Sequence, residues 1–272
     1  MNRSASPVHG AVDKATDNDA FQYAARAGFA ASGVLHLLLA YIILRLALGT
    51  GGNADQSGAL AALASQPGGA VMLWIAAIGL FALGLWHLAE AVVGSKPSER
   101  SGNDDSPAWK RAKSVGLAIA NIAIAFSAMR FAMGAGQSSG QQNSGVSAQL
   151  MQSGWGKAVL IVIGLGVLGV GGYHVYKGVS QKFFKDLRVS GGTGITAVGV
   201  AGYVAKGLAL AGAGILVAFA TWEADPAKAS GLDAAVKTLG QAPFGKFLLI
   251  LAALGIAAFG LYSFVRSRYG RL

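Results

Sequence analysis

The chain has 272 residues, of which 53% are hydrophobic and 12% charged, and its mean hydropathy is +0.50. This composition excludes most soluble globular proteins and is typical of an integral membrane protein. The net charge of +10 would suggest nucleic-acid binding in a soluble protein, but here the charges lie between long apolar runs and indicate membrane topology. With no cysteine and only four histidines, the chain has little material for a metal or thiol site. We therefore expect no enzymatic activity, no cofactor, no metal and no nucleic-acid partner.

Six apolar runs are each long enough to cross a hydrocarbon core about 30 Å thick. They cover residues 27–48, 70–93, 115–133, 158–179, 198–222 and 246–265. The stretch before the first run lacks the basic leader and cleavage site of a signal peptide, so we expect this run to stay in the mature chain. The sequence thus predicts an all-α polytopic membrane bundle of six transmembrane helices, preceded by a flexible cytoplasmic tail at residues 1–21.

Lys and Arg residues are unevenly distributed between the two sides of the membrane. Sixteen fall in the amino-terminal tail, the second and fourth connections and the carboxyl end, with Lys206 assigned to the fourth connection, whereas four fall in the other three connections. Because Lys and Arg are retained in the cytoplasm, we expect an inner (plasma) membrane protein with both ends cytoplasmic. Arg45 and Arg130 lie inside spans near their outer ends. In one interpretation each side chain extends separately to water or lipid phosphate at the membrane surface. In the other, the two arginines and Glu223 form a ring of charges at the outer side.

The membrane domain consists of three tandem helix-pair repeats, at residues 22–94, 108–187 and 198–272. Small residues recur every seven positions along both helices of the repeat, which places them on one face of each helix. Helices in lipid associate where small residues let their backbones approach closely. We predict that these faces are helix contacts, and that the closest approaches involve Gly33, Gly84, Gly171, Gly207 and Gly260.

Several motifs of the repeat resemble a known family. They are the run Gly202-Tyr203-Val204-Ala205-Lys206-Gly207, the entries Pro67-Gly68-Gly69 and Pro243-Phe244-Gly245 to second helices, and a Gly-x-aromatic pattern near the end of those helices. Together they resemble the bacterial "domain of unknown function 1206" proteins, common in actinobacteria, over residues 22–272. The resemblance implies an inner-membrane protein with six spans in three two-helix repeats, and it implies no catalytic residues. The middle unit departs from the pattern, with Lys113 and Ala118 in place of glycines and Gly154 in place of proline.

Polar residues inside the spans are candidates for function, because an ionisable group in a membrane is costly and usually faces the bundle interior. His36 lies near the middle of the first span, and Asn121 takes the equivalent position in the third. One interpretation is a neutral, packed imidazole that is hydrogen-bonded to a neighbour. The other is a polar path for protons or ions past His36, Asn121, Arg45, Arg130 and Glu223.

Aromatic and histidine residues lie near the inner ends of the second helices, at Trp86, His87, Tyr173, His174 and Tyr262. Aromatic residues at this depth are typical of the membrane interface. Proton handling or metal binding is the alternative for the two histidines.

The outer connections are poor in charge, but residues 58–65, 146–152 and 232–239 carry apolar side chains at helical spacing. We predict a short helix in each, lying on the membrane surface, capping the bundle or docking a partner. The whole pattern favours a non-enzymatic membrane component that binds membrane lipids or a membrane or envelope protein partner. The alternative is a small transporter or channel that uses the polar path.

Overall fold

A computed structural model describes residues 19–93, 107–189 and 191–271. Within these ranges strand pairing is limited to one isolated bridge, between Leu187 and Gly270. The long helices are α2 (Asp19–Ala47), α4 (Gly69–Val93), α5 (Pro107–Ala132), α7 (Gly154–Val179), α8 (Thr193–Glu223) and α10 (Gly245–Tyr269). All six are long and apolar enough to cross a membrane, which confirms the all-α fold predicted from the sequence. Residues 1–18 of the predicted tail lie outside the described residues, and residues 19–21 belong to α2.

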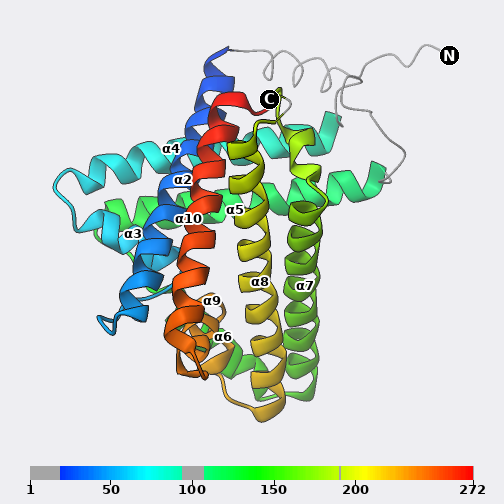
Figure 1. Cartoon of the computed structure of the whole chain (residues 1–272). Helices are drawn as coiled ribbons and strands as arrows, with labels where there is room; N and C mark the ends of the chain where they lie inside the picture. The colour runs from blue at the N-terminus through cyan, green and yellow to red at the C-terminus, as the bar shows by residue number, and fades with distance from the viewer. Residues whose placement is uncertain (1–18, 94–106, 190, 272) are drawn as a thin grey trace.

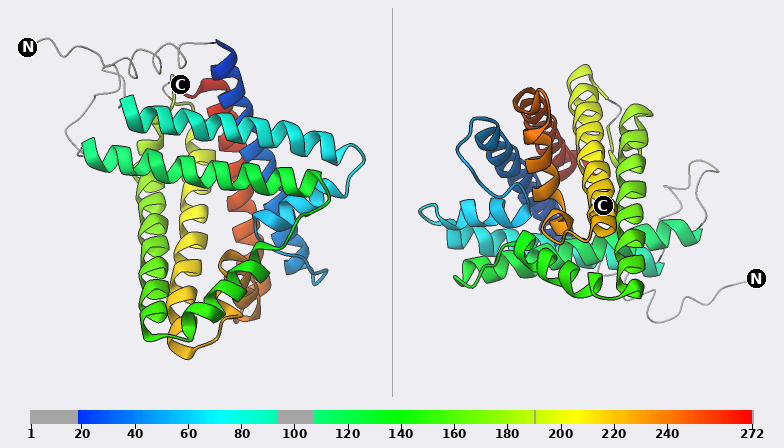
Figure 2. Two further views of the ribbon diagram at one scale, coloured as in Figure 1. Left: turned by 180° about the vertical axis from the view of Figure 1, so that it is seen from behind. Right: turned by 90° about the horizontal axis from the view of Figure 1, so that it is seen from below.

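The long helices are arranged in a layer with a hairpin across it. Helices α7, α8, α10 and α2 stand side by side, whereas α4 and α5 run together across one face of this layer (Figure 1). The start of α2 and the end of α10 lie at the same end of the layer, which we call the terminal face, and we call the opposite end the cap face. The view from behind in Figure 2 shows the same crossing. The three helix pairs are therefore not parallel to one another.

The crossing of α2 over α4 depends on two glycines. A Cβ atom on Gly28 would overlap the carbonyl oxygen of Gly79, so the two backbones touch with no side chain between them. A backbone contact this close allows a steep crossing, and the side chains of Ala25, Phe29, Leu83 and Trp86 pack beside it.

The most extensive helix contacts join each unit to the next in a cycle. They pair α4 with α5, α7 with α8, and α10 with α2, so that the second helix of one unit packs on the first helix of the following unit. The last unit packs on the first in the same way. The triplicated sequence therefore folds with a cyclic order of contacts.

Equivalent small residues form each of these three interfaces. A Cβ on Gly171 would lie 2.6 Å from the carbonyl oxygen of Gly207, and a Cβ on Gly260 would lie 3.0 Å from that of Gly33. A Cβ on Gly84 would lie 3.3 Å from the carbonyl oxygen of Ala118. The structure thus places the five glycines selected from the sequence at close helix approaches, one approach in each pair.

The first helices of the units end at a residue in the left-handed conformation. Gly49 has φ +80° and Gly134 has φ +74°, and the amide of the next residue bonds back to the carbonyl of Arg45 at 2.9 Å or of Arg130 at 2.8 Å. This is the Schellman ending of a helix, which glycine favours because it has no Cβ. Helix α8 ends in the same way, but with Ala224 at φ 55°.

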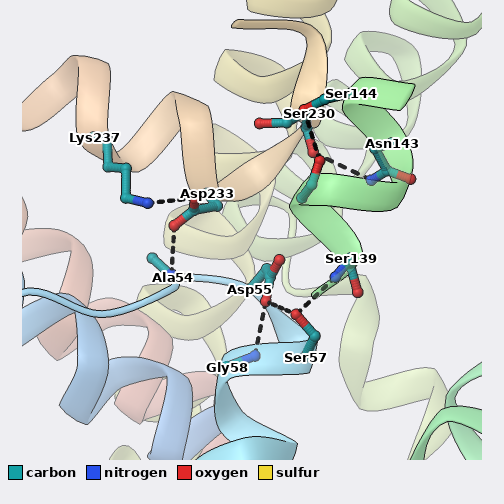
Figure 3. Close-up of polar contacts among 11 residues, drawn as sticks. Ala54, Asp55, Ser57, Gly58, Ser139, Asn143, Ser144, Ser230, Asp233 and Lys237 are labelled. Carbon is teal, nitrogen blue, oxygen red and sulfur yellow. Dashed lines mark hydrogen bonds and ion pairs between the residues drawn. The ribbon is translucent and has the colours of Figure 1, made fainter. Parts of the chain in front are cut away.

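The connections within the three helix pairs meet at the cap face, where the predicted short helices are confirmed as α3 (Gln56–Ala64), α6 (Ser139–Met151) and α9 (Leu232–Gln241). Figure 3 shows the polar contacts among them. The Asp233 carboxylate accepts a bond from the Ala54 amide at 2.7 Å, and the Ser57 hydroxyl accepts one from the Ser139 amide at 3.0 Å. One connection from each repeat thus contributes to a single cap.

Candidate functional site at the terminal face

One position of the repeat carries a charged residue in all three units. It is occupied by Glu90 in α4, Lys177 in α7 and Arg266 in α10. Each lies near the carboxyl-terminal end of the second helix of its unit. Sequence analysis overlooked this column, although the alignment of the second helices contains it. An ionisable group at the same place in every unit indicates a shared role for the position.

Each of these charged groups contacts the first helix of the next unit. The Lys177 Nζ lies 5.1 Å from the ring centroid of Tyr203, and the Arg266 guanidinium lies 4.3 Å from that of Phe29. Tyr203 and Phe29 occupy equivalent repeat positions. The third member of this set is Ser114, whose hydroxyl donates to Glu90 at 3.5 Å.

Two of the three charged groups have a close polar partner. Lys177 Nζ lies 2.5 Å from an oxygen of Asp186, and Nδ1 of His87 lies 2.8 Å from an oxygen of Glu90. Burial alone would raise the pKa of the Asp186 carboxyl, but the nearby Lys177 and Arg266 outweigh this effect and lower the pKa to about 2. Asp186 is therefore ionised at neutral pH and neutralises Lys177.

The connection that carries Asp186 folds back against the bundle. Its short helix η2 (Lys182–Asp186) inserts the fully buried Phe183 side chain among aromatic rings. The hydroxyl of Tyr262 donates to the Phe183 carbonyl at 3.1 Å, and Nε of Arg271 donates to the Leu187 carbonyl at 2.8 Å. These bonds fix the carboxylate beside Lys177.

Arg266 has no such partner. Its Nε is buried and has no hydrogen-bond partner among the described residues. The two carboxylates that act on it electrostatically are Asp186 and Glu90, and each is already bonded to another group. The Arg266 side chain as a whole is only partly buried, but a buried N–H donor without an acceptor is costly, since its lost hydration is not replaced. The Nε donor of Arg266 therefore lacks one acceptor among the described residues.

Lys206 adds a second positive charge to this region. It lies inside α8 and not in the fourth connection, which corrects the assignment made in the charge count. Its Nζ lies 4.0 Å from the ring centroid of Phe259, and it makes no hydrogen bond or ion pair with a described residue. Side chains of a helix point toward the amino-terminal end of that helix. Lys206 on α8 is thus directed toward the terminal face and Arg266 on α10 away from it, so that the two cations approach the same level.

The predicted polar path is not assembled. Nδ1 of His36 donates to the Ser32 carbonyl at 2.7 Å, and the His36 ring lies 4.8 Å from that of Phe259. The amide of Asn121 donates to the Leu117 carbonyl of its own helix at 2.8 Å. The remaining members lie toward the cap-face ends of their helices: Arg45 bonds to Thr50, Glu223 pairs with Lys228, and Arg130 is exposed. No described contact joins any two of the five.

The residues expected at the inner membrane interface are mostly inside the protein. Trp86 and His87 are 5% and 6% exposed and Tyr262 is fully buried, whereas Tyr173 and His174 are partly exposed. The interface interpretation is therefore wrong for Trp86, His87 and Tyr262. Their helix faces are covered because each second helix packs on the first helix of the next unit.

The fold and the cyclic contacts define a multi-pass membrane protein built from three tandem helix pairs. The chain belongs to the family described as Domain of Unknown Function (DUF1206), whose model matches it three times, over residues 27–94, 112–181 and 201–270. It is also similar to an uncharacterized protein of Bacillus subtilis (strain 168), YxxB, with 29% identity over 249 residues that cover 90% of this chain and 89% of the relative. No solved structure matches the chain.

Proposed function

We propose that this protein is a non-enzymatic membrane component that binds the phosphate group of an anionic phospholipid between α2, α8 and α10. The observation that carries the proposal is the unpartnered Nε of Arg266, at a repeat position where Lys177 pairs with Asp186 and Glu90 bonds to His87. A guanidinium presents N–H donors in a planar fork that matches two oxygens of a phosphate. A phosphate would supply the acceptor that the described residues lack.

The depth of the site favours a lipid as the source of this phosphate. Arg266 lies three residues before the end of α10, which corresponds to about 5 Å along the helix axis. We therefore expect it near the level of lipid headgroups. Lys206 starts further along the bundle from the terminal face, and its Nζ lies 4.0 Å from the ring centroid of Phe259. Basic pockets between transmembrane helices at this level are suited to anionic headgroups, whose acyl chains remain in the bilayer.

We further propose that the terminal face is the cytoplasmic side of the plasma membrane. The ends of the helices at this face carry the basic residues Arg26, Lys113, Lys177, Arg266 and Arg268. The connections at the cap face carry fewer Lys and Arg residues. This asymmetry is typical of proteins that retain their basic segments in the cytoplasm.

Native mass spectrometry of the purified protein in neutral detergent tests the proposal. Titration with phosphatidylglycerol should give binding at least about tenfold tighter than titration with phosphatidylcholine, and Arg266→Gln should remove most of this difference. The matched control is Arg130→Gln, which removes the same charge near the cap end of α5 and should change nothing. Equal binding of the two lipids by the natural protein, or equal effects of the two substitutions, would contradict the proposal.

A third titration separates a lipid from a soluble anion. Glycerol phosphate carries the same charged group without acyl chains. It should not displace phosphatidylglycerol at matched concentration. Displacement would show that the site takes a soluble phosphate and would overturn the assignment to a lipid.

A further inference from the structure

Helices α5 and α7 of the middle unit lack a contact that the other two units make. In the first unit α2 packs on α4 and in the third α8 packs on α10, but α5 and α7 show no comparable interface within the described residues. These two helices are also the least covered, with 17% of their apolar windows buried against 50% for α2. The cycle of helix contacts is therefore open at one place.

The sequence of the middle unit nevertheless contains the residues for this contact. In the third unit, a Cβ on Gly255 would overlap the Cβ of Ala205 across the α8 to α10 interface. The repeat places Gly166 and Gly116 at these two positions in the middle unit. Neither has a neighbouring heavy atom within 4 Å of its Cβ position. Glycine in the interior of a helix lowers the stability of that helix, and in membrane proteins it is favoured where a second helix packs closely against it.

Helices α5 and α7 already contact each other near the terminal face. The Nζ of Lys113 on α5 lies 5.7 Å from the ring centroid of Tyr173 on α7. In the third unit the equivalent of Tyr173 is Tyr262, and it meets Tyr203, with 5.2 Å between ring centroids. The equivalent of Tyr203 is the residue that follows Lys113. The contact between α5 and α7 in the middle unit therefore lies one residue away from the position at which α8 and α10 meet in the third unit.

We propose that α4 and α5 swing as one hairpin about these terminal-face contacts, so that α5 packs along α7 with Gly116 against Gly166. The six long helices then form a closed ring of three units. The bilayer favours this arrangement, because a helix that lies across its neighbours cannot cross the hydrocarbon core together with them. The α4 to α5 interface at Gly84 is kept, since both helices move together. This inference goes beyond lipid binding and does not depend on it.

Cysteine cross-linking in native membranes tests the closed ring, and the chain has no cysteine of its own. The pair Gly116→Cys and Gly166→Cys should form a disulfide within one chain on mild oxidation, measured as loss of both thiols from a maleimide mass tag on the monomer band. The positive control is Gly164→Cys with Ala218→Cys, because a Cβ on Gly164 would lie 3.3 Å from that of Ala218. The negative control is Gly116→Cys with Gly172→Cys, since Gly172 is exposed on another face of α7. Free thiols in the test pair beside a linked positive control, or a link between two chains, would overturn the proposal.

A single substitution gives an independent test. Gly172 corresponds to the exposed residues Leu85 and Leu261 of the other units, whereas Gly166 corresponds to Gly79 and Gly255. Both glycines have open space when α5 lies across the layer. In lipid nanodiscs, Gly166→Leu should lower the melting temperature clearly and Gly172→Leu should leave it unchanged. Equal melting temperatures for the two variants would show that α5 never packs on α7.

Discussion

The Nζ atom of Lys177 lies 2.5 Å from an oxygen of Asp186, and this ion pair ties α7 to the connection that follows it. Only 7% of the Lys177 side chain and 22% of the Asp186 side chain are exposed. The pair is therefore partly shielded from water and contributes more than an ion pair on an open surface.

The pH dependence of stability should report this pair. The pKa of Asp186 is lowered from 3.8 to about 2, so its contribution is complete above about pH 4 and is lost as the pH falls through 2. The loss corresponds to about 2 kcal/mol. Thermal melting between pH 5 and pH 2 should show this decline in the natural protein and a smaller decline in Asp186→Asn. Identical pH profiles would contradict the assignment.

Removing one partner of the pair should cost more than removing both. Asp186→Asn leaves the buried Lys177 ammonium without its counter-ion and should destabilise the protein by about 3 kcal/mol at pH 7. The double variant Asp186→Asn with Lys177→Met should recover part of this loss. An additive loss measured at the same pH would show that the two groups do not interact.

The α7 to α8 interface should be sensitive to added volume. Gly171→Leu places a side chain where a Cβ already lies 2.6 Å from the Gly207 carbonyl oxygen, so it should cost about 1–3 kcal/mol or prevent folding. The control is Leu165→Ala on the same helix, whose side chain is 56% exposed. Equal melting temperatures of the two variants in detergent would show that this is not a tight interface.

The end of α8 offers a stabilising substitution. Ala224 has φ 55°, a conformation that costs a residue with a Cβ about 1 kcal/mol. Ala224→Gly should therefore raise stability by up to about this amount, while Gly134→Ala at the equivalent ending of α5 should lower it. Opposite signs in thermal melting are expected, and a loss of stability in both would contradict the common ending.

Topology can be checked with the structure's exposed positions. Asn53→Cys, Gln141→Cys and Ala227→Cys at the cap face should react with an impermeant maleimide in intact cells, because these three positions are exposed. Lys185→Cys, exposed at the terminal face, should react only after the cells are permeabilised. The reverse pattern would place the terminal face outside.

Much of the fold could be predicted from the sequence, because long apolar runs and the glycine columns reflect local constraints. The crossing of α4 and α5 could not, since hydropathy gives the length of a helix but not its angle to its neighbours. Lys206 was assigned to a connection although it lies within the fifth apolar run, and the column of Glu90, Lys177 and Arg266 was present in the alignment. No alignment could show that, of these three residues, Arg266 has no hydrogen-bond acceptor for its Nε among the described residues, because Asp186 reaches Lys177 only through the folded connection.

The most direct test of the account is the distance between Arg266 and a lipid phosphorus atom. Solid-state NMR can measure it between ¹⁵N of the arginine side chains and ³¹P in bilayers of phosphatidylglycerol, with Arg266→Gln used to identify the signal. One arginine signal should lie about 4 Å from phosphorus, as in a direct hydrogen-bonded contact, and Arg266→Gln should remove it while Arg130→Gln should not. A short distance that survives in Arg266→Gln, or the absence of any short distance, would contradict a phosphate at this site.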